Sequence, residues 1–373
     1  MRDQILTQAK RLVVKVGSSL IATRGAGLQP DRIEQLATEL VALRREGREI
    51  LLVTSGAIVS GIQKLGLTAY PTHLPVKQAA AAVGQSRLMW AYEKAFERLG
   101  QGVAQILLTH QDLADRRRFL NARHTLTTLL GFGVMPIINE NDTVAVDEIR
   151  VGDNDSLAAE VALLVDAELL IILSDVEGLY TADPRQDKTA TLIPLVDEIT
   201  DDLARRAGTS QTFEGTGGMV TKLRAAKKAT TYGVGTMILN GAKPGLLLDA
   251  LRGTEAGTFF SPRPRKLNSR KHWIAFTLRA KGQLILDPGA VDALVSRGKS
   301  LLPSGIVEVG GDFVPGDALT CVDADGKEIA KGLVNFSSET LRRIKGCKTA
   351  DIQAILGSQE YEEAIHRDNL VIL

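Results

Sequence analysis

Two short stretches of the chain combine a lysine with glycines and hydroxyl residues. The first is VVKVGSS at residues 13–19, and the second is EGTGGMVTK at residues 214–222. Glycine has no Cβ, so backbone N–H groups at such turns can approach phosphate oxygens, and a nearby lysine adds a mobile cation. Both stretches therefore predict a site for an anion. The alternative for each is a glycine-rich turn beside a solvated lysine.

The spacing of the second stretch differs from the P-loop of common NTPases, G-x-x-x-x-G-K-[ST]. Lys222 follows Thr221 rather than a glycine, and Leu223 comes after it. The residues that follow have helical periodicity, with recurring positions at Met219, Leu223, Ala226 and Thr230. The stretch thus predicts a helix that begins near residue 218 and carries Lys222 close to its first turn.

Other polar residues lie where predicted strands end or a predicted helix begins. They are Ser55 in VTSGAI, Asp142 in INENDT, Asp153, Asn154 and Asp155 in VGDNDSL, and Ser174 and Asp175 in SDVEG. Open α/β sheets usually bind ligands at the carboxyl ends of their strands, which favours one shared site. Two local alternatives stay open. The Asp/Asn run can simply cap a helix, and Ser55 with Gly56 can form only a tight turn.

Together these residues suit phosphoryl transfer. Lys15 and Lys222 supply cations for phosphate oxygens, while the acidic and amide groups can hold a substrate ammonium and orient the lysines. Phosphoryl transfer depends mainly on positioning and charge stabilisation, so it needs no protein nucleophile. The sequence shows no Ser/His/Asp set that would indicate one.

Short apolar runs alternate with longer periodic stretches between residues 11 and 239. The runs are rich in Val, Ile and Leu, as in buried strands of a parallel sheet, and occupy residues 11–16, 49–54, 103–108, 134–138, 168–173 and 235–239. The longer stretches have helical periodicity and occupy residues 30–46, 55–66, 76–99, 115–131, 153–166 and 218–232. This alternation predicts an α/β fold class, a layered α/β/α domain with a mostly parallel sheet and helices on both faces.

The character of the chain changes near residue 261. SPRPRKLNSRK contains two prolines and five Lys or Arg residues, as expected of an exposed linker. Beyond it the strand signals are short and separated by turns, and Asp325-Gly326 between apolar runs indicates a hairpin. The tail therefore predicts a small β-rich barrel with helices at 288–297 and 338–345.

The composition is typical of a globular protein, and the net charge of the chain is small. The 373 residues are 44% hydrophobic and 24% charged, with a formal net charge of +1, so any attraction for phosphate must be local. No apolar run approaches the about 20 residues of a membrane span, and the first residues do not resemble a signal peptide. We therefore expect no membrane association and a cytoplasmic location.

Cysteine and histidine are sparse and lack the spacing of metal ligands. Cys321 and Cys347 are far apart, so neither a disulfide nor a structural zinc site is predicted. The histidines are more consistent with packing or surface roles than with metal binding, and they are His73, His110, His124, His272 and His366.

The motifs occur in an order that resembles the amino acid kinase family. They are VVKVGSS, VTSGAI, KQAAAAVGQ, RFLNARHTL, PIINENDTVAVDEIRVGDND, SDVEGLYTADPR and GTGGMVTKL. The members most similar in these motifs phosphorylate glutamate, and the tail from about residue 275 resembles the PUA domain of bacterial forms. The resemblance implies a catalytic domain at 1–260, a basic linker at 261–274 and a PUA-like domain at 275–373.

The resemblance also implies an activity and roles for individual residues. ATP would phosphorylate the side-chain carboxylate of L-glutamate, with Mg²⁺ on the ATP phosphates and no direct protein ligand assigned to the metal. Catalysis would fall to Lys15, Lys222 and Asp155, and glutamate binding to Ser55, Asp142 and Asn154. The implied ATP-binding positions are Lys15, Gly17, Ser174, Asp175, Thr216, Gly217, Gly218, Met219, Val220, Thr221 and Lys222. Many relatives have Thr where this chain has Ser174.

The family further suggests inhibition by proline and a homo-oligomer, a dimer or a tetramer. One alternative is a relative acting on N-acetylglutamate or aspartate, but such relatives usually have paired glycines after the first lysine, and this chain has only Gly17. A second alternative is an RNA-binding regulator. Residues 272–373 contain 11 Lys and Arg against 14 Asp and Glu, which is poorly suited to phosphate contacts, so RNA is not expected as a partner.

Overall fold

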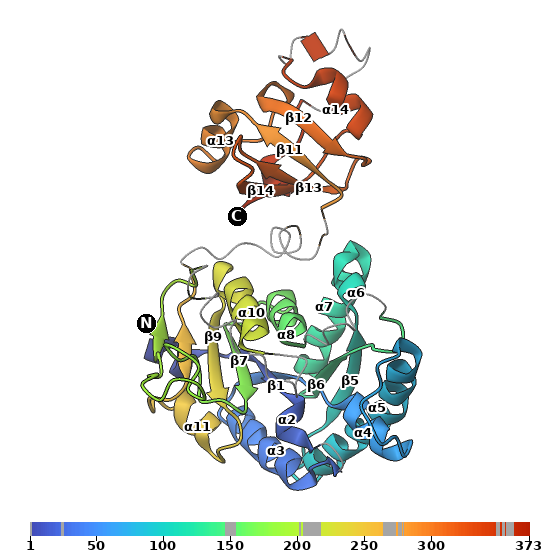
Figure 1. The fold of residues 1–373 in the computed structure, drawn as a ribbon, viewed down its shortest axis with the longest axis vertical. Coiled ribbons are helices and arrows are strands. Elements are labelled where there is room, and N and C mark those ends of the chain that lie inside the picture. Colours follow the sequence, from blue (N-terminus) through green and yellow to red (C-terminus); the bar gives the residue numbers. More distant parts are fainter. Residues whose placement is uncertain are drawn as a thin grey trace. The chain divides into compact units, whose positions relative to one another are not determined.

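The structure is a computed structural model of the 373-residue chain. It describes residues 2–23, 26–145, 154–200, 203, 218–263, 274, 278, 280–347, 351–352, 355 and 362–373, with only the backbone of Arg116. The chain divides into two compact units, one made mostly of residues up to Lys266 and the other mostly of residues from Leu267 onward (Figure 1). Across the described ranges, no helix combines the length and apolar character needed to cross a membrane.

A mostly parallel sheet forms the centre of the first unit. Within the described residues its strand order is β5-β6-β4-β1-β7-β9-β10-β8. The strands are β1 (Arg11–Val16), β4 (Glu49–Val53), β5 (Val103–Leu108), β6 (Met135–Glu140), β7 (Leu169–Ser174), β8 (Leu195–Val196), β9 (Gly235–Asn240) and β10 (Thr258–Phe260). All six strands predicted from apolar runs are confirmed. The sequence did not predict β8 and the antiparallel β10, which are too short to give a pattern.

Helices cover both faces of this sheet, which confirms the layered α/β/α fold class (Figure 1). One face is covered by α1 (Arg2–Gln8), α3 (Pro30–Arg45), α5 (Leu74–Glu97) and α11 (Leu246–Leu251), with α4 (Ala57–Lys64) packed on α5. The opposite face carries α8 (Asn154–Leu164) and α10 (Met219–Thr231), beside α7 (Arg116–Gly131). The short helices α2 (Ser18–Ile21) and α6 (His110–Ala114) follow β1 and β5, and β2 (Ala22–Thr23) pairs with β3 (Gly27–Leu28).

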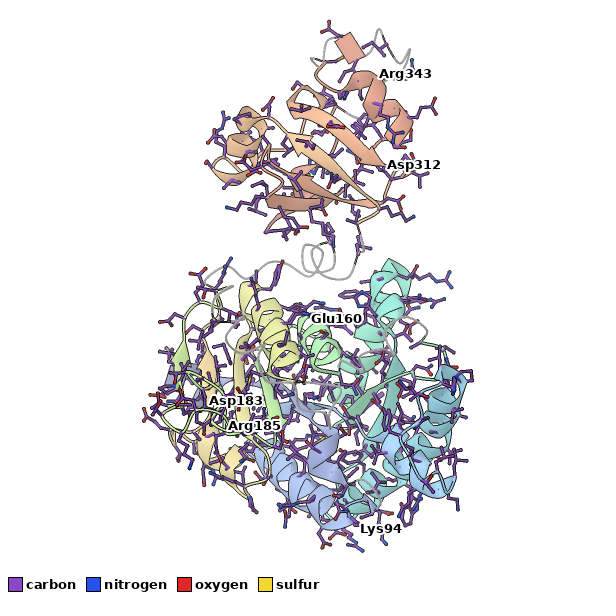
Figure 2. The ribbon with its side chains drawn as sticks, viewed as in Figure 1. Lys94, Glu160, Asp183, Arg185, Asp312 and Arg343 are labelled. Carbon is purple, nitrogen blue, oxygen red and sulfur yellow. The ribbon has the colours of Figure 1, made fainter. Side chains whose placement is uncertain are left out.

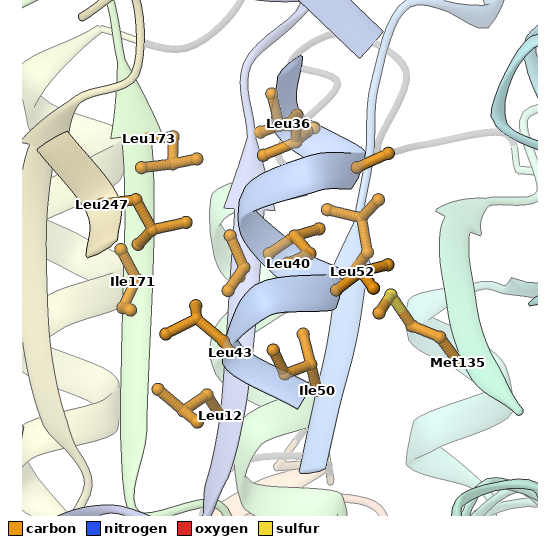
Figure 3. Close-up of a cluster of buried hydrophobic side chains, with 14 of the residues drawn as sticks. Leu12, Leu36, Leu40, Leu43, Ile50, Leu52, Met135, Ile171, Leu173 and Leu247 are labelled. Atoms are coloured by element: carbon orange, nitrogen blue, oxygen red, sulfur yellow. The ribbon is translucent and has the colours of Figure 1, made fainter. Parts of the chain in front are cut away.

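The central strand β1 has apolar side chains on both faces, because it is covered on both sides. Leu12, Val14 and Val16 belong to the core under α3 and α11, together with residues of β4, β7 and β9 (Figure 3). Successive side chains of a strand point to opposite faces. Val13 and Lys15 therefore face the other layer, where α8 packs on β1. The strand thus brings a lysine to the α8 side of the sheet.

Arg48 is a buried arginine that joins the ends of two helices. Its Nη1 donates to Leu6 O (2.9 Å), and its Nη2 donates to Thr7 O (3.2 Å) and Leu251 O (3.3 Å). These carbonyl groups lie at the carboxyl ends of α1 and α11, where a cation is favoured. The guanidinium therefore satisfies carbonyl groups at both helix ends, and its bonds to Leu6 O and Leu251 O are buried.

Replacing Arg48 by methionine should lower the free energy of unfolding by about 2–4 kcal/mol, because buried carbonyls lose a charged donor. Denaturant unfolding would measure the loss. Arg45→Met is the matched control, since the exposed Arg45 makes a single 3.3 Å bond to Leu99 O. A loss no larger than that of the control would contradict this role for Arg48.

The second unit is built on a five-stranded sheet of order β12-β11-β13-β14-β15. Its strands are β11 (Gly282–Leu286), β12 (Ile306–Gly311), β13 (Ala318–Val322), β14 (Glu328–Leu333) and β15 (Leu370–Ile372), and its helices are α13 (Pro288–Val295) and α14 (Ser338–Ile344). The two helices, the β-rich character and the hairpin at Asp325-Gly326 are confirmed, and Gly326 has φ of 80° in that turn. The strand β15 was not predicted.

Candidate active site

The buried carboxylate of Asp155 lies at the centre of the site. Asp155, in the first turn of α8, is 1% exposed, and its Oδ1 is 2.6 Å from Lys15 Nζ of β1. Its Oδ2 lies 3.1 Å from Lys222 Nζ and accepts a 2.7 Å hydrogen bond from Thr221 Oγ1, both on α10. One side chain therefore connects the central strand with the two helices on the α8 face of the sheet.

The charges of this cluster explain the pKa of Asp155. Burial alone would raise it, but the nearby ammonium groups of Lys15 and Lys222 outweigh burial and lower the pKa to about 2. The carboxylate is therefore ionised at neutral pH. Two buried ammonium groups thus lie against this one carboxylate, and cations held in this way suit the binding of phosphate oxygens.

Glycines leave space beside both lysines. A Cβ at Gly17, just after β1, would lie 4.0 Å from Lys15 Nζ and 3.7 Å from Ser19 Oγ. At Gly218, the residue before α10, no described atom lies within 4 Å of the position a Cβ would take. No described atom near Gly17 or Gly218 would clash with a Cβ, so the fold itself does not require glycine there. The space beside the backbone at both positions suits the approach of a ligand.

A cluster of neutral polar groups adjoins the charged one. Asn154, the residue before Asp155, donates from Nδ2 to Thr54 O (2.8 Å), Ser55 Oγ (2.9 Å) and Asn139 Oδ1 (3.0 Å). Asn139, near the end of β6, donates in turn to Gln85 Oε1 of α5 at 2.8 Å. The Oδ1 of Asn154 is buried and has no hydrogen-bond partner among the described residues. A buried acceptor of this kind is ready for a donor from a ligand.

Asp142 follows β6, in the turn directly after Asn141. Burial raises the pKa of Asp142 to about 6, so its carboxyl group titrates close to neutral pH. Ionisable groups with strongly shifted pKa values gather at functional sites. Its position at the end of a sheet strand agrees with the predicted location of the site.

Ser174 ends β7, and its Oγ donates to Asp175 Oδ1 at 3.1 Å. Ser174 is buried and Asp175 is exposed. The loop after them is held by Glu177, whose Oε1 accepts from Asn240 Nδ2 (2.9 Å) and lies 2.8 Å from Lys243 Nζ. The segment following β7 is thereby fastened to the segment following β9.

The chain is similar to known proteins along its whole length. The model of the amino acid kinase family matches residues 10–240, and that of the PUA domain matches residues 282–356. The glutamate 5-kinase of Geobacter sulfurreducens is 54% identical over 373 residues, which are 100% of both chains. That of Syntrophus aciditrophicus is 51% identical and covers 100% of this chain and 96% of the relative. This chain belongs to the amino acid kinase family.

Among solved structures, the UMP kinase of Bacillus anthracis is similar at 15% identity and a TM-score of 0.47, covering 68% of this chain and 96% of that chain. The family assignment rests on the sequence relatives, which match the full length of the chain. As a member of the amino acid kinase family with a PUA domain, the protein is an ATP-dependent kinase.

The structure brings together the predicted residues that belong to β1, α8 and α10. Lys15, Asp155 and Lys222 are in contact, and Ser55 contacts Asn154. Four of the predicted ATP-binding residues lie at the start of α10: Gly218, Met219, Val220 and Thr221. The side chain of Val220 is partly exposed there. Thr216, Gly217 and Asp153 fall outside the described residues. The predicted helix start near residue 218, with Lys222 in the first turn, is confirmed.

Sequence reasoning missed several residues that adjoin the site. Asn139 ends an apolar run in the same way as Ser55, so its position at a strand end was an available signal. Gln85 and Glu177 had no such signal, because their contacts depend on how separate segments pack. Thr221 was expected among the backbone contacts to phosphate, and the structure adds a side-chain bond to Asp155.

Proposed function

We propose that the protein is a glutamate 5-kinase. It would transfer the γ-phosphoryl group of ATP to the side-chain carboxylate of L-glutamate, giving ADP and L-glutamyl 5-phosphate in the first step of proline biosynthesis. The name borne by relatives of the same length supports the substrate. One observation at the start of α8 carries the proposal. Asp155 contacts two charged lysines, whereas its neighbour Asn154 contacts neutral polar groups.

Asp155 and Asn154 would each serve a different reactant. Asp155 holds the two lysines, whose charges suit the phosphates of ATP. Asn154 holds the neutral cluster with Ser55 and Asn139, and its buried Oδ1 can accept from the ammonium group of an amino acid. Two reactants bound on either side of one helix start would meet in a fixed geometry, which accelerates transfer.

The reaction needs charge stabilisation more than proton transfer. The side-chain carboxylate of glutamate is already ionised at neutral pH, so it can attack the γ-phosphorus without a general base. Lys15 and Lys222 would stabilise the charge on the transferring group and on the leaving ADP. Asp155 would keep both ammonium groups directed toward the same point.

Mg²⁺ is expected to enter with ATP. Among the described residues, no group of three His, Cys, Asp or Glu side chains could hold a metal ion. An ion carried on the ATP phosphates would neutralise part of their charge. Removing the metal with EDTA should abolish turnover, and excess Mg²⁺ should restore it.

The substrate is tested by comparing acceptors. We expect kcat/KM, measured from ADP release, to be at least about 100-fold higher for L-glutamate than for N-acetyl-L-glutamate or L-aspartate, because unpaired buried polar groups penalise the wrong ligand. Preference for either alternative would move the substrate assignment within the family. Equal, background release with all three would contradict the proposal.

The pH dependence should report Asp142. If its carboxylate holds the substrate ammonium, kcat/KM for glutamate should rise with pH through about 6, the raised pKa of Asp142, and then level off. Below that pH the carboxyl is neutral and its attraction for an ammonium is lost. Asp142→Asn should remove this rise and lower kcat/KM about 10- to 100-fold, with little change in the KM for ATP. An unchanged pH profile in the variant would exclude Asp142 as the titrating group.

Regulation and assembly follow the same proposal. Proline, the cyclic end product of that pathway, would compete with glutamate in or beside the glutamate pocket near residues 142–154. The enzyme would be a cytoplasmic homo-oligomer, a dimer or a tetramer. Initial rates at several glutamate and proline concentrations would test the competition, and light scattering would give the mass of the assembly.

We further propose the domain limits 1–260, 261–274 and 275–373 for the kinase domain, the linker and the PUA-like domain. The matched ranges 10–240 and 282–356 support this division. RNA is not expected as a partner of the PUA-like domain, because acidic residues slightly outnumber basic ones in that domain. Filter binding at physiological salt would test this, and tight retention of RNA would contradict it.

A further inference from the structure

Glu160 is a buried carboxylate in an otherwise apolar part of α8. Every other residue from Leu157 to Leu164 is Leu, Ala or Val, and the Glu160 side chain is only 5% exposed. Its Oε1 lies 2.6 Å from Lys228 Nζ of α10 and 2.9 Å from Nδ1 of His110, the first residue of α6. Figure 2 shows Glu160 on α8, the helix that packs against α10.

Two ion pairs therefore join α8 to α10. The first is Asp155 with Lys222, and the second is Glu160 with Lys228. The second pair lies five residues farther along α8 and six farther along α10, a rise of about 7.5 Å and about 9 Å. The helices thus run in the same direction. The second pair adds to the first pair, to the hydrogen bond from Thr221 to Asp155 and to the packing of the two helices, and it restrains α10 at a point farther along α8.

The two pairs differ in what a bound nucleotide would do to them. Lys15 and Lys222 would contact phosphate oxygens as well as Asp155 during transfer, so the pair at Asp155 is shared with the ligand. Glu160 and Lys228 lie farther down the helices and keep their contact. We propose that Glu160 is a positioning residue, which holds Lys228 and thereby sets the reach of Lys222 toward the transferring phosphoryl group. This inference rests on the proposed phosphoryl transfer.

The surroundings of Glu160 favour the charged pair. Burial would raise its pKa, but attraction to Lys228 and the hydrogen bond with His110 outweigh burial, so the pKa is lowered and the carboxylate stays ionised at neutral pH. Lys228 has an 18% exposed side chain, whereas that of His110 is 42% exposed. Water can replace the histidine more readily than the lysine. Lys228 is therefore the main partner.

The test compares Lys228→Met and Glu160→Gln with Lys227→Met, the exposed neighbouring lysine on the same helix. Rates are measured per folded molecule, at least 10 °C below the melting temperature of each variant. We expect kcat to fall about 10- to 100-fold in Lys228→Met, less in Glu160→Gln, and not in Lys227→Met, because displacements near 1 Å cost rates of this order. The KM for glutamate should stay within about threefold of the wild type. Lys228→Arg should recover part of the loss.

A purely structural pair would behave differently. It would lower the melting temperature and leave kcat per folded molecule unchanged, which would overturn the proposal. Glu160→Leu with Lys228→Leu removes both charges, and such apolar replacements can restore stability. A double variant with restored melting temperature but low kcat supports positioning, and full recovery of kcat contradicts it.

A second measurement separates this inference from the proposed substrate. If the wild type does not phosphorylate glutamate, the proposed function fails, but ATP affinity can still be measured by titration calorimetry. Misplaced Lys222 should weaken ATP binding about threefold or more in Lys228→Met and not in Lys227→Met. Equal ATP affinities in the wild type and both variants would overturn the positioning role.

Discussion

Lys222→Met is expected to lower kcat by about 10³-fold while the KM for glutamate changes little. The ammonium group is buried, it lies 3.1 Å from Asp155 Oδ2, and α10 begins only a few residues before it. A cation held in such surroundings acts mainly on charge that develops on the transferring group, so its removal is felt in the transition state. Methionine keeps the apolar stem and should preserve the packing of the helix.

Steady-state rates with ATP and glutamate would measure this effect. Lys227→Met is the control, because it removes a lysine from an exposed position on the same helix. Lys222→Arg should restore little, since a planar guanidinium does not reproduce the compact ammonium. If Lys222→Met retained near-normal kcat, the lysine would have no catalytic role.

The second large effect is expected for Asp155→Asn. Two buried ammonium groups would lose the carboxylate between them, and breaking a buried pair in this way costs about 3–5 kcal/mol of stability. The variant should also lose about 10²-fold in kcat, because Lys15 and Lys222 are no longer aligned by one side chain. The KM for ATP should not rise, since the site becomes more positive.

Thermal unfolding with and without ATP distinguishes this account from simple misfolding. Phosphates would replace the missing anion, so ATP should raise the melting temperature of Asp155→Asn more than that of the wild type. The pKa of Asp155 is lowered from its ordinary value of 3.8 to about 2 in the folded protein. The stabilisation by Asp155 should therefore be complete above pH 3.8 and should be lost as the pH falls through about 2. A variant with wild-type stability and a raised KM for ATP would show that Asp155 binds the nucleotide rather than aligning the lysines.

The sequence predicted the sheet and most of its helices because their patterns are local. Buried parallel strands are apolar on both faces, so β1 and β7 appear as continuous runs of Val, Ile and Leu. Lys15 stands out because it lies within such an apolar run, where a charged side chain needs a buried partner. The structure supplies that partner as Asp155, which a local reading left open between a ligand group and a helix cap.

The parts that escaped prediction depend on contacts between distant segments. Glu160 contacts Lys228, 68 residues away, and Asn139 contacts Gln85, 54 residues away. No spacing rule links such pairs. A single glutamate within the apolar run from Leu157 to Leu164 was nevertheless a visible irregularity, because a buried carboxylate requires a charged partner.

The most direct test of the central claim traps the product itself. The purified protein would be incubated with ATP, Mg²⁺, L-glutamate and hydroxylamine, which converts an acyl phosphate into a hydroxamate, and Lys222→Met would be run beside it. The account predicts hydroxamate that depends on both ATP and glutamate and falls to near background in the variant. Absence of hydroxamate from the wild type, or an equal yield from the variant, would contradict it.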